Sequence, residues 1–544
     1  MYTLDMLENF DPNTIADEAV RQIVLYLMKR VENLEAKVQE QAEEIQRLGD
    51  ENNRLQGEQG KPKSKVNKSA SPQSSEKERW ESKARHKESK QAKIRIERVE
   101  VLQVDHECLP QDAQFKGYEE VIVQDSDFRT ENIKFRKEKD YSPSHQQTYL
   151  AELPAGSKGQ FGPGVRAWVL SLYYAARMSE PKILELVHTV GMHISAGQLS
   201  DVLIKDQEQC HAEREAVVRA GLTSRPWQHL DSTGTSVNGK NEHGHVLCNP
   251  FSTAYWTFPS KDRLSLLRVL MGGAEPAFRL HELAFTLLQQ LGVAKKWCKK
   301  LTQLLPHEQD WTETQLDARR DEHLPKLGEK LRKLLQDGLA IAAYRTQTAY
   351  PVVELLICDD APQFNWLTVE LALCWIHEFR HDKKLIPCLP SHRQLLDTFK
   401  QSFWKVYRKL LAYRRNPNPK DAEYLPGDFE QLFEQTSGYE QLDERRALTL
   451  AKKEQLLVVL IPPEILLHNH PAQLGARQRV RKRDVSLQTR TREGIGAWDT
   501  FQTLVSTAKK LELNSYQYLH DRLAQRNQLP SFAQLIEERV HNVP

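Results

Sequence analysis

The chain has 544 residues and a mass of 62.9 kDa, which is enough for several domains. Charged residues make up 28% of it, the mean hydropathy is −0.62, and the absence of any long uninterrupted apolar run excludes an integral membrane protein. The net charge is only +2, and the acidic first twenty residues, broken by Pro12, argue against a secretory signal peptide. Seven isolated cysteines suggest free thiols in a reducing cytoplasm.

Residues 24–55 show a heptad repeat of apolar residues within a predicted dimerisation helix at 1–60. β-Branched residues at position a with Leu at position d favour a parallel two-stranded coiled coil, and a buried Asn at a fixes its register. The alternative is a long amphipathic helix that packs on its own chain. The residues expected to meet in the dimer are Leu27, Val31, Leu34, Val38, Ile45, Leu48, Asn52 and Leu55.

Two segments of different character follow this helix. Residues 61–98 are rich in Lys and Ser with few large apolar residues, so we expect a flexible basic linker, with phosphate contact as a compatible role. Residues 99–160 are expected to form a small β-rich domain, because the stretches IRIERVEVLQV and EEVIVQD alternate as strands do. A lone Cys108 beside His106 cannot form a structural zinc site.

Residues 161–222 are expected to form a small helical domain. Pro163 opens the first helix, Ser179 caps the second, Gly191 ends it, and Ser195 caps the third. Two short helices joined by a glycine turn are typical of a helix-turn-helix, although many other small helical domains share this pattern.

Residues 223–500 are expected to form an α/β core. Its first strand is apolar until it reaches Asp231, and two further short strands complete a meander. A long helical stretch is predicted from 261 to about 348.

A near-continuous apolar run, VVELLICDD, predicts a strand that is buried on both faces and ends in Asp359 and Asp360, with a helix at about 364–379. Carboxylates at the ends of neighbouring buried strands are costly unless they bind a cation. Mg²⁺ or Mn²⁺ prefers oxygen ligands, so the pattern indicates a metal site; the alternative is that each Asp caps a turn.

Three stretches resemble motifs of the insertion sequence 66 family of bacterial transposases: QHLDSTGTSVNGKNEHGHVLCNP, LLICDDAPQFN with the following ALCWIHEFRH, and HNHPAQLGARQRVRKRD. The resemblance covers nearly the whole chain and implies an RNase H-like core that cleaves and joins DNA with Mg²⁺ or Mn²⁺. It implies catalytic roles for Asp231 and Asp359, with Asp360 as a second candidate for the same metal position. The third acid of the family falls on Gln473.

Gln473 departs from the family pattern, because an amide brings no negative charge to a metal ion. The resemblance therefore leaves two hypotheses: an active transposase, or a decayed copy that only binds DNA as a dimer. Glu464 and Glu493 are the alternative candidates for a substitute third acid. The expected setting is the nucleoid of a bacterial cytoplasm, with element ends and target DNA as partners and room for accessory proteins.

A dense basic run follows Gln473, and we interpret it as a contact with DNA phosphates. The alternative is a solvated loop. The C-terminal residues 501–544 read as two helices packed on the core. Cys374, His377 and His381 share one helical face, which we interpret as a packed or DNA-facing side, with a partial zinc site as the alternative. The basic run comprises Arg477, Arg479, Arg481, Lys482 and Arg483.

Overall fold

The structure is a computed structural model that describes residues 12–55, 96, 98–103, 118–124, 130–154, 156–157 and 159–542. The predicted linker, apart from residues 96 and 98, and the segment around Cys108 lie outside these residues. Within the described part of the chain, no helix combines the length and apolar character needed to cross a membrane.

A five-stranded mixed sheet forms the centre of the fold, with strand order β5-β4-β3-β8-β9. The predicted meander is confirmed as the antiparallel strands β3, β4 and β5, and β8 is confirmed beside β3 as a parallel strand. All four residues of β8 are buried, as its apolar run predicts. The strands are β3 (Trp227–Val237), β4 (Lys240–Cys248), β5 (Thr253–Phe258), β8 (Leu355–Cys358) and β9 (Glu370–Leu373).

The helix predicted at 364–379 is wrong. A 3-10 turn, η5 (Pro362–Phe364), is followed by the edge strand β9, which pairs in parallel with β8, and only then by α13 (Trp375–Asp382). The sequence Glu-Leu-Ala-Leu of β9 suits a helix equally well, so the available edge of β8 decides its conformation.

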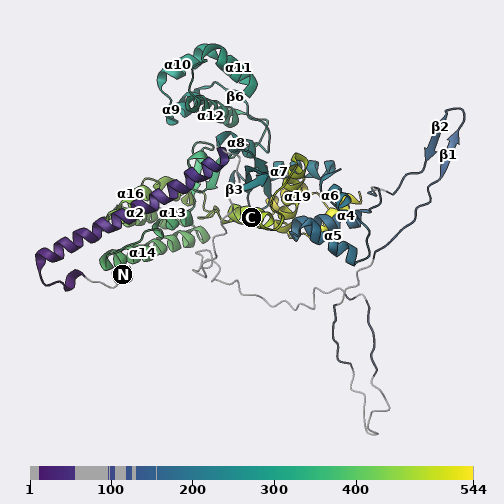
Figure 1. The fold of residues 1–544 in the computed structure, drawn as a ribbon, viewed down its shortest axis with the longest axis horizontal. Helices are drawn as coiled ribbons and strands as arrows, with labels where there is room; N and C mark the ends of the chain where they lie inside the picture. The colour runs from purple at the N-terminus through teal and green to yellow at the C-terminus, as the bar shows by residue number, and fades with distance from the viewer. Residues whose placement is uncertain are drawn as a thin grey trace, which may run out of the picture.

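The stretch between β5 and β8 is a mostly helical lobe. In Figure 1 its elements α9 to α12 gather above the sheet, with α8 at the base. Apolar side chains of the lobe belong to the same core as the sheet. The elements are α8 (Arg263–Leu270), β6 (Phe278–Arg279), α9 (Glu282–Gln290), α10 (Lys295–Leu304), β7 (Asp310–Trp311), α11 (Glu313–His323) and α12 (Glu329–Thr346).

A second group of helices follows β9 and packs through aromatic side chains. Trp375 lies against Phe403, Tyr407 and Phe429, with ring centroids 5.4 to 6.1 Å apart. The long helix α2 (Glu18–Leu55), preceded by η1 (Pro12–Thr14), lies along this group in Figure 1. The other helices are α14 (Pro390–Arg415), α15 (Pro419–Glu434), α16 (Glu440–Leu450), α17 (Lys453–Leu456) and η6 (Val458–Leu460).

The three helices expected in 161–222 are confirmed as α4, α5 and α6. Ser195 caps α6 with a complete capping box, and Gly191 has a positive φ of 82° just after α5. A π-helical turn and a fourth helix, α7, complete this part. The bounds are α4 (Pro163–Leu170), η4 (Ser171–Ala175), α5 (Glu180–Thr189), α6 (Ala196–Ile204) and α7 (Glu208–Ser224).

The C-terminal helices join these helices in one core that is separate from the main core under the sheet. Tyr174, for example, stacks on Phe501 with ring centroids 4.8 Å apart. The predicted boundary at residue 501 is therefore wrong, because α19 begins at Arg492 and packs with α4 to α7. We call α4–α7 and α19–α21 the helical unit. Its last members are α19 (Arg492–Lys510), α20 (Ser515–Leu523) and α21 (Phe532–His541).

Residues 130–154 contain one isolated hairpin of β1 (Lys139–Ser142) and β2 (Gln147–Leu150), which stands apart from the helices in Figure 1. The other strands predicted nearby are wrong for the described residues, since 96, 98–103 and 118–124 have no regular structure. Val99 and Val121 are 82% and 74% exposed, so their alternating pattern finds no partner strand or core.

Candidate functional site

Asp231 lies on β3, and Asp359 directly follows β8, the parallel neighbour of β3. The pairing of the two strands runs as far as His229 and Ile357, and the same register continued by two residues would set Asp231 opposite Asp359. The Oδ1 atom of Asp231 accepts the Ser232 N–H at 2.9 Å, and that of Asp359 accepts the Ala361 N–H at 3.2 Å. We call these two carboxylates the acid pair.

The acid pair is a costly arrangement without a cation. Burial raises the pKa of Asp231 from 3.8 to about 6, and the negative charge of Asp359 adds to the rise. The guanidinium of Arg380 and the Ser232 N–H act in the opposite direction. A desolvated carboxylate beside a second one binds a cation more readily than an exposed Asp does.

Asp360 is held away from the acid pair by an ion pair. Its Oδ2 lies 2.5 Å from Lys452 Nζ, which also contacts both oxygens of the buried Glu378 at 2.9 and 3.1 Å. Arg445 contacts the same Glu378 carboxylate at 3.1 Å. The structure therefore places Asp359 opposite Asp231 and gives Asp360 a structural role, in contrast to its predicted place in the metal site.

Asn469 joins the three stretches that carry the family resemblance. Its Nδ2 donates to the carbonyl of Leu230 at 2.8 Å, and its Oδ1 lies 3.1 Å from His229 Nδ1. Its backbone N–H donates to Cys374 Sγ at 3.3 Å. Burial lowers the pKa of His229 to about 3, so the ring is neutral and its Nδ1–H donates to Asn469. Asn469 thus fixes the start of α18 beside Asp231.

The helix α18 (His470–Ser486) carries Gln473 across β3 and β4. Close approach needs two glycines, because a Cβ on Gly244 would lie 2.7 Å from Arg479 Cδ and one on Gly475 would lie 2.6 Å from Val246 Cγ1. Gln473 sits in the first turn of the helix. Gln473 is therefore carried by a helix that packs against the strand of Asp231.

Gln473 contacts His377 on α13, and His377 contacts Arg380. The Gln473 amide nitrogen lies 3.3 Å from His377 Nδ1, and Arg380 Nη1 lies 3.1 Å from His377 Nε2. Burial and then the charge of Arg380 lower the pKa of His377, while Asp359 acts in the opposite direction. These electrostatic effects place His377 and Arg380 beside the acid pair.

The donor set fits a magnesium ion only in part. Mg²⁺ is commonly bound through one or two carboxylates together with phosphates of its substrate, and the acid pair supplies two carboxylates. In the described part of the chain, no group of three or more His, Cys, Asp or Glu side chains could hold a metal. The zinc alternative at Cys374 gains no support for the same reason, because no such group among the described residues includes this thiol.

Glu464 and Glu493 are exposed, and the structure brings neither to the acid pair. Glu493 follows Arg492, whose guanidinium pairs with Glu242 at 2.6 Å. Glu242 lies opposite Thr235, four residues beyond Asp231 along β3, which is about 13 Å at the usual rise of a strand.

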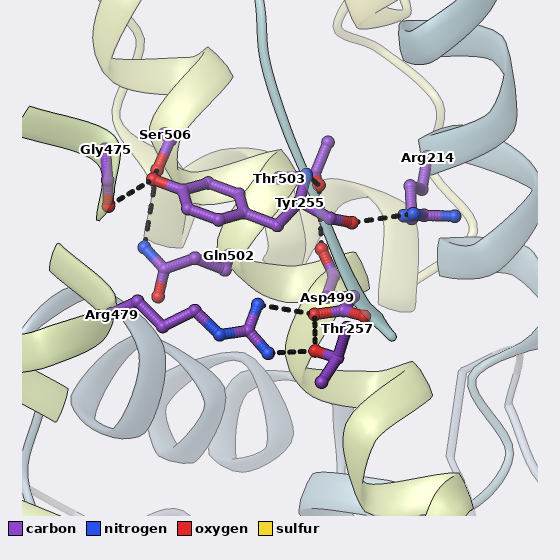
Figure 2. A network of polar contacts seen from close by, with 9 residues as sticks. All are labelled: Arg214, Tyr255, Thr257, Gly475, Arg479, Asp499, Gln502, Thr503 and Ser506. Carbon is purple, nitrogen blue, oxygen red and sulfur yellow. Dashed lines mark hydrogen bonds and ion pairs between the residues drawn. The ribbon is translucent and has the colours of Figure 1, made fainter. Parts of the chain in front are cut away.

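Two of the basic residues predicted to contact DNA are buried, so the prediction is wrong for them. Arg479, 1% exposed, donates to Asp499 and Thr257 (Figure 2). Its guanidinium also lies over the ring of Trp498. Lys482, also 1% exposed, donates to the carbonyl of Met178 at 2.7 Å and lies over the Tyr173 ring.

Burial also lowers the pKa of the Lys482 side chain from 10.5 to about 7. Figure 2 shows how Arg479 and Tyr255 tie β5 to α18 and α19, with Arg214 of α7 donating to the Tyr255 carbonyl. These residues join the sheet to the helical unit instead of facing a ligand.

The remaining members of the basic run are still compatible with the predicted contact with DNA phosphates. Arg477 and Arg481 are exposed, and Arg483 is half-buried with one N–H donated to the Gly234 carbonyl. Since only every third or fourth residue of α18 faces the sheet, one face of the helix is structural and the other carries free charge.

Sequence reasoning missed Asn469, His377 and Arg380 as neighbours of the acid pair. The only signal was their presence in the stretches that resemble the family. Their contacts depend on β9, which orients α13, and that strand was not predicted.

A protein of Sinorhizobium fredii (strain NBRC 101917 / NGR234), named uncharacterized protein y4jO, is 29% identical to this chain over 307 residues. The matched residues make up 56% of this chain and 94% of that protein. No family model matches the chain.

Proposed function

We propose that the protein is a transposase that cleaves and joins DNA at the acid pair with Mg²⁺ or Mn²⁺, on an RNase H-like core. The observation that carries this proposal is that Asp231 on β3 and Asp359 directly after the adjacent parallel strand β8 interact electrostatically, with the pKa of Asp231 raised to about 6. The helix α18, packed across β3 and β4, supports the same interpretation. Asp360 is no longer part of the proposed metal site.

The chain contributes position and charge to this reaction. The chemistry that a bound Mg²⁺ supplies is activation of the attacking oxygen and stabilisation of the leaving oxygen in an in-line phosphoryl transfer. The register of β3 and β8 fixes the separation of the two carboxylates. Asp231 is ionised, and therefore ready to bind a cation, above a pH of about 6. Exposed Arg380 places a positive charge beside them, where DNA phosphate would approach.

A second candidate is a decayed copy that binds DNA without cutting it, and Gln473 favours it. An amide in place of the third carboxylate leaves two protein charges for the metal ions instead of three. Such a protein would retain the exposed arginines of α18 and the helical unit for DNA contact.

Dimerisation through α2 belongs to both candidates. The helix is docked on its own chain and still presents an apolar stripe, because Leu27, Leu34, Val38, Ile45 and Leu48 are each at least 51% exposed. The two alternatives drawn from the heptad pattern are therefore compatible, and a second copy of α2 is the partner that the pattern fits.

Strand cleavage tests the proposal. Purified protein is incubated with labelled DNA carrying the ends of its own element, with Mg²⁺, Mn²⁺ or EDTA. Metal-dependent nicking that Asp231→Asn and Asp359→Asn abolish, and that Asp360→Asn retains, is the expected result.

Nicking that survives both substitutions in the acid pair would refute the site. Binding of the element ends without any nicking would favour the decayed copy.

A further inference from the structure

The contact between Gln473 and His377 has a direction that Arg380 determines. Arg380 Nη1 lies 3.1 Å from His377 Nε2, and a guanidinium can only donate hydrogen bonds. The Nε2 atom must therefore accept, so it carries no proton. A neutral imidazole with a bare Nε2 carries its proton on Nδ1, which becomes a donor.

The Nδ1–H group then needs an acceptor, and the Gln473 amide lies against it at 3.3 Å. The nitrogen and oxygen of a glutamine amide are interchangeable in position, and hydrogen bonding decides between the two orientations. With the nitrogen toward His377, two donors would face each other. The carbonyl oxygen therefore faces Nδ1, and the NH₂ group is directed away from His377.

This orientation changes what the third position offers to the site. The Gln473 carbonyl, the one atom of its side chain that can ligate Mg²⁺, is used by His377. The free end of the side chain then carries two N–H donors, and Arg380 supplies a positive charge at the other nitrogen of the same imidazole ring. Donors and a cation recognise an anionic oxygen rather than a metal ion.

We propose that His377 positions Gln473 as a hydrogen-bond donor to a phosphate oxygen of DNA, in place of a metal-ligating third acid. This inference deepens the proposed function, since it assigns the phosphate of the bound strand to Gln473 and Arg380. Phosphate binding through these donors needs no metal ion, so it can be measured separately from cleavage.

DNA affinity without metal is the first test, measured by fluorescence anisotropy in EDTA with element-end duplex. Gln473→Glu replaces the donors by a negative charge, and the affinity should fall about tenfold or more, as expected for loss of a hydrogen bond to a charged group. Leu474→Glu is the matched control, because it adds the same charge at the next position, where the side chain is 47% exposed, and should cost much less. Equal losses in the two variants would overturn the proposal.

The tautomer of His377 is the second test, and it needs no stable variant of Gln473. ¹⁵N NMR of histidine-labelled protein, with the His377 signals assigned by their loss in His377→Asn, should show a neutral ring protonated at Nδ1. A ring protonated at Nε2 would overturn the inference. So would Gln473→Glu protein that binds DNA as well as the parent in EDTA and gains Mg²⁺-dependent cleavage, since the carbonyl would then be a weak metal ligand.

The two proposals fail separately. A parent that never cleaves, combined with loss of metal-free affinity in Gln473→Glu alone, would remove the transposase activity and support Gln473 as the phosphate donor.

Discussion

The docking of α2 depends on one buried carboxylate. Glu32 is 3% exposed, and its Oε1 accepts the backbone N–H groups of Cys388 and Leu389 at 2.6 and 2.9 Å. Its Oε2 accepts His392 Nδ1 at 2.7 Å. These donors stand at the positive N-terminal end of α14, where a carboxylate is favoured. In the described part of α2, Met28 is the one buried apolar side chain, and two further hydrogen bonds join the helix to α16: Gln441 Nε2 donates to the Glu32 carbonyl at 3.1 Å, and Asn33 Nδ2 donates to Glu440 at 3.3 Å.

Glu32→Ala should therefore release α2 without unfolding the rest of the protein. Removing one partner from a buried hydrogen-bonded pair costs about 3 to 5 kcal/mol. A loss of about 3 kcal/mol raises the undocked fraction more than a hundredfold, at 1.36 kcal/mol for each tenfold change. Amide hydrogen exchange should become faster by that factor for residues 18–40 and for the amides of Cys388 and Leu389, while exchange in the sheet stays unchanged.

Exposed Glu40 on the same helix supplies the control, and Glu40→Ala should leave exchange as in the parent. Two results would refute the reasoning. Unchanged protection in Glu32→Ala would show that other contacts hold α2. Equally faster exchange in β3 and β8 would show that α2 is part of the cooperative core.

Three further outcomes follow from burial and exposure. Asp231→Asn should stabilise the protein at pH 7.5, by up to about 3 kcal/mol, because the folded pKa of about 6 exceeds the ordinary 3.8 and ionisation in the folded state is unfavourable. In the parent, the stabilisation from protonated Asp231 is complete below pH 3.8 and is lost as the pH rises through 6, so the stability gain of Asp231→Asn should vanish at pH 3.5. Thermal melts of parent and variant at pH 7.5 and 3.5 check this. An equal gain at both pH values would contradict it. Arg479→Ala should lower stability by about 3 to 5 kcal/mol, since it leaves Asp499 buried without its partner, whereas Arg481→Ala should melt as the parent does and weaken DNA binding. Calorimetry and anisotropy on both variants separate these effects, and similar melting of the two would remove the distinction. Replacing Leu34 and Leu48 together by Lys should convert a dimer into a monomer in light scattering, and an unchanged mass would exclude the zipper.

Local signals were sufficient to predict much of the fold. The capped helix at Ser195, the meander whose first strand carries Asp231 and the buried strand before Asp359 are each encoded in contiguous sequence, and all three are present. The acid pair was predictable for a related reason, because Asp359 directly follows a short apolar strand, whereas Asp231 lies within β3, which continues to Val237 beyond the predicted strand end. RNase H-like identity remains a proposal.

Features that depend on distant partners were not predictable. The edge strand β9 has a sequence that suits a helix, and only the free edge of β8 makes it a strand. The arginines of α18 look alike in sequence, and burial separates Arg479 from Arg481 only because β5 and α19 lie against one side of the helix. Asn469 acts across more than two hundred residues to reach Leu230.

The helical unit combines helices that precede the sheet in the sequence, α4 to α7, with helices that follow it, α19 to α21. The Glu213 carboxylate on α7 accepts the Phe532 N–H at 3.0 Å, across 319 positions of the chain. During synthesis α4 to α7 leave the ribosome long before α19 to α21, at the usual rate of about 5–20 residues per second, so they wait tens of seconds for the partners that complete their core. A nascent chain would thus carry the strands of the sheet before the second half of the helical unit exists, and a chain interrupted before residue 492 would lack α19 to α21.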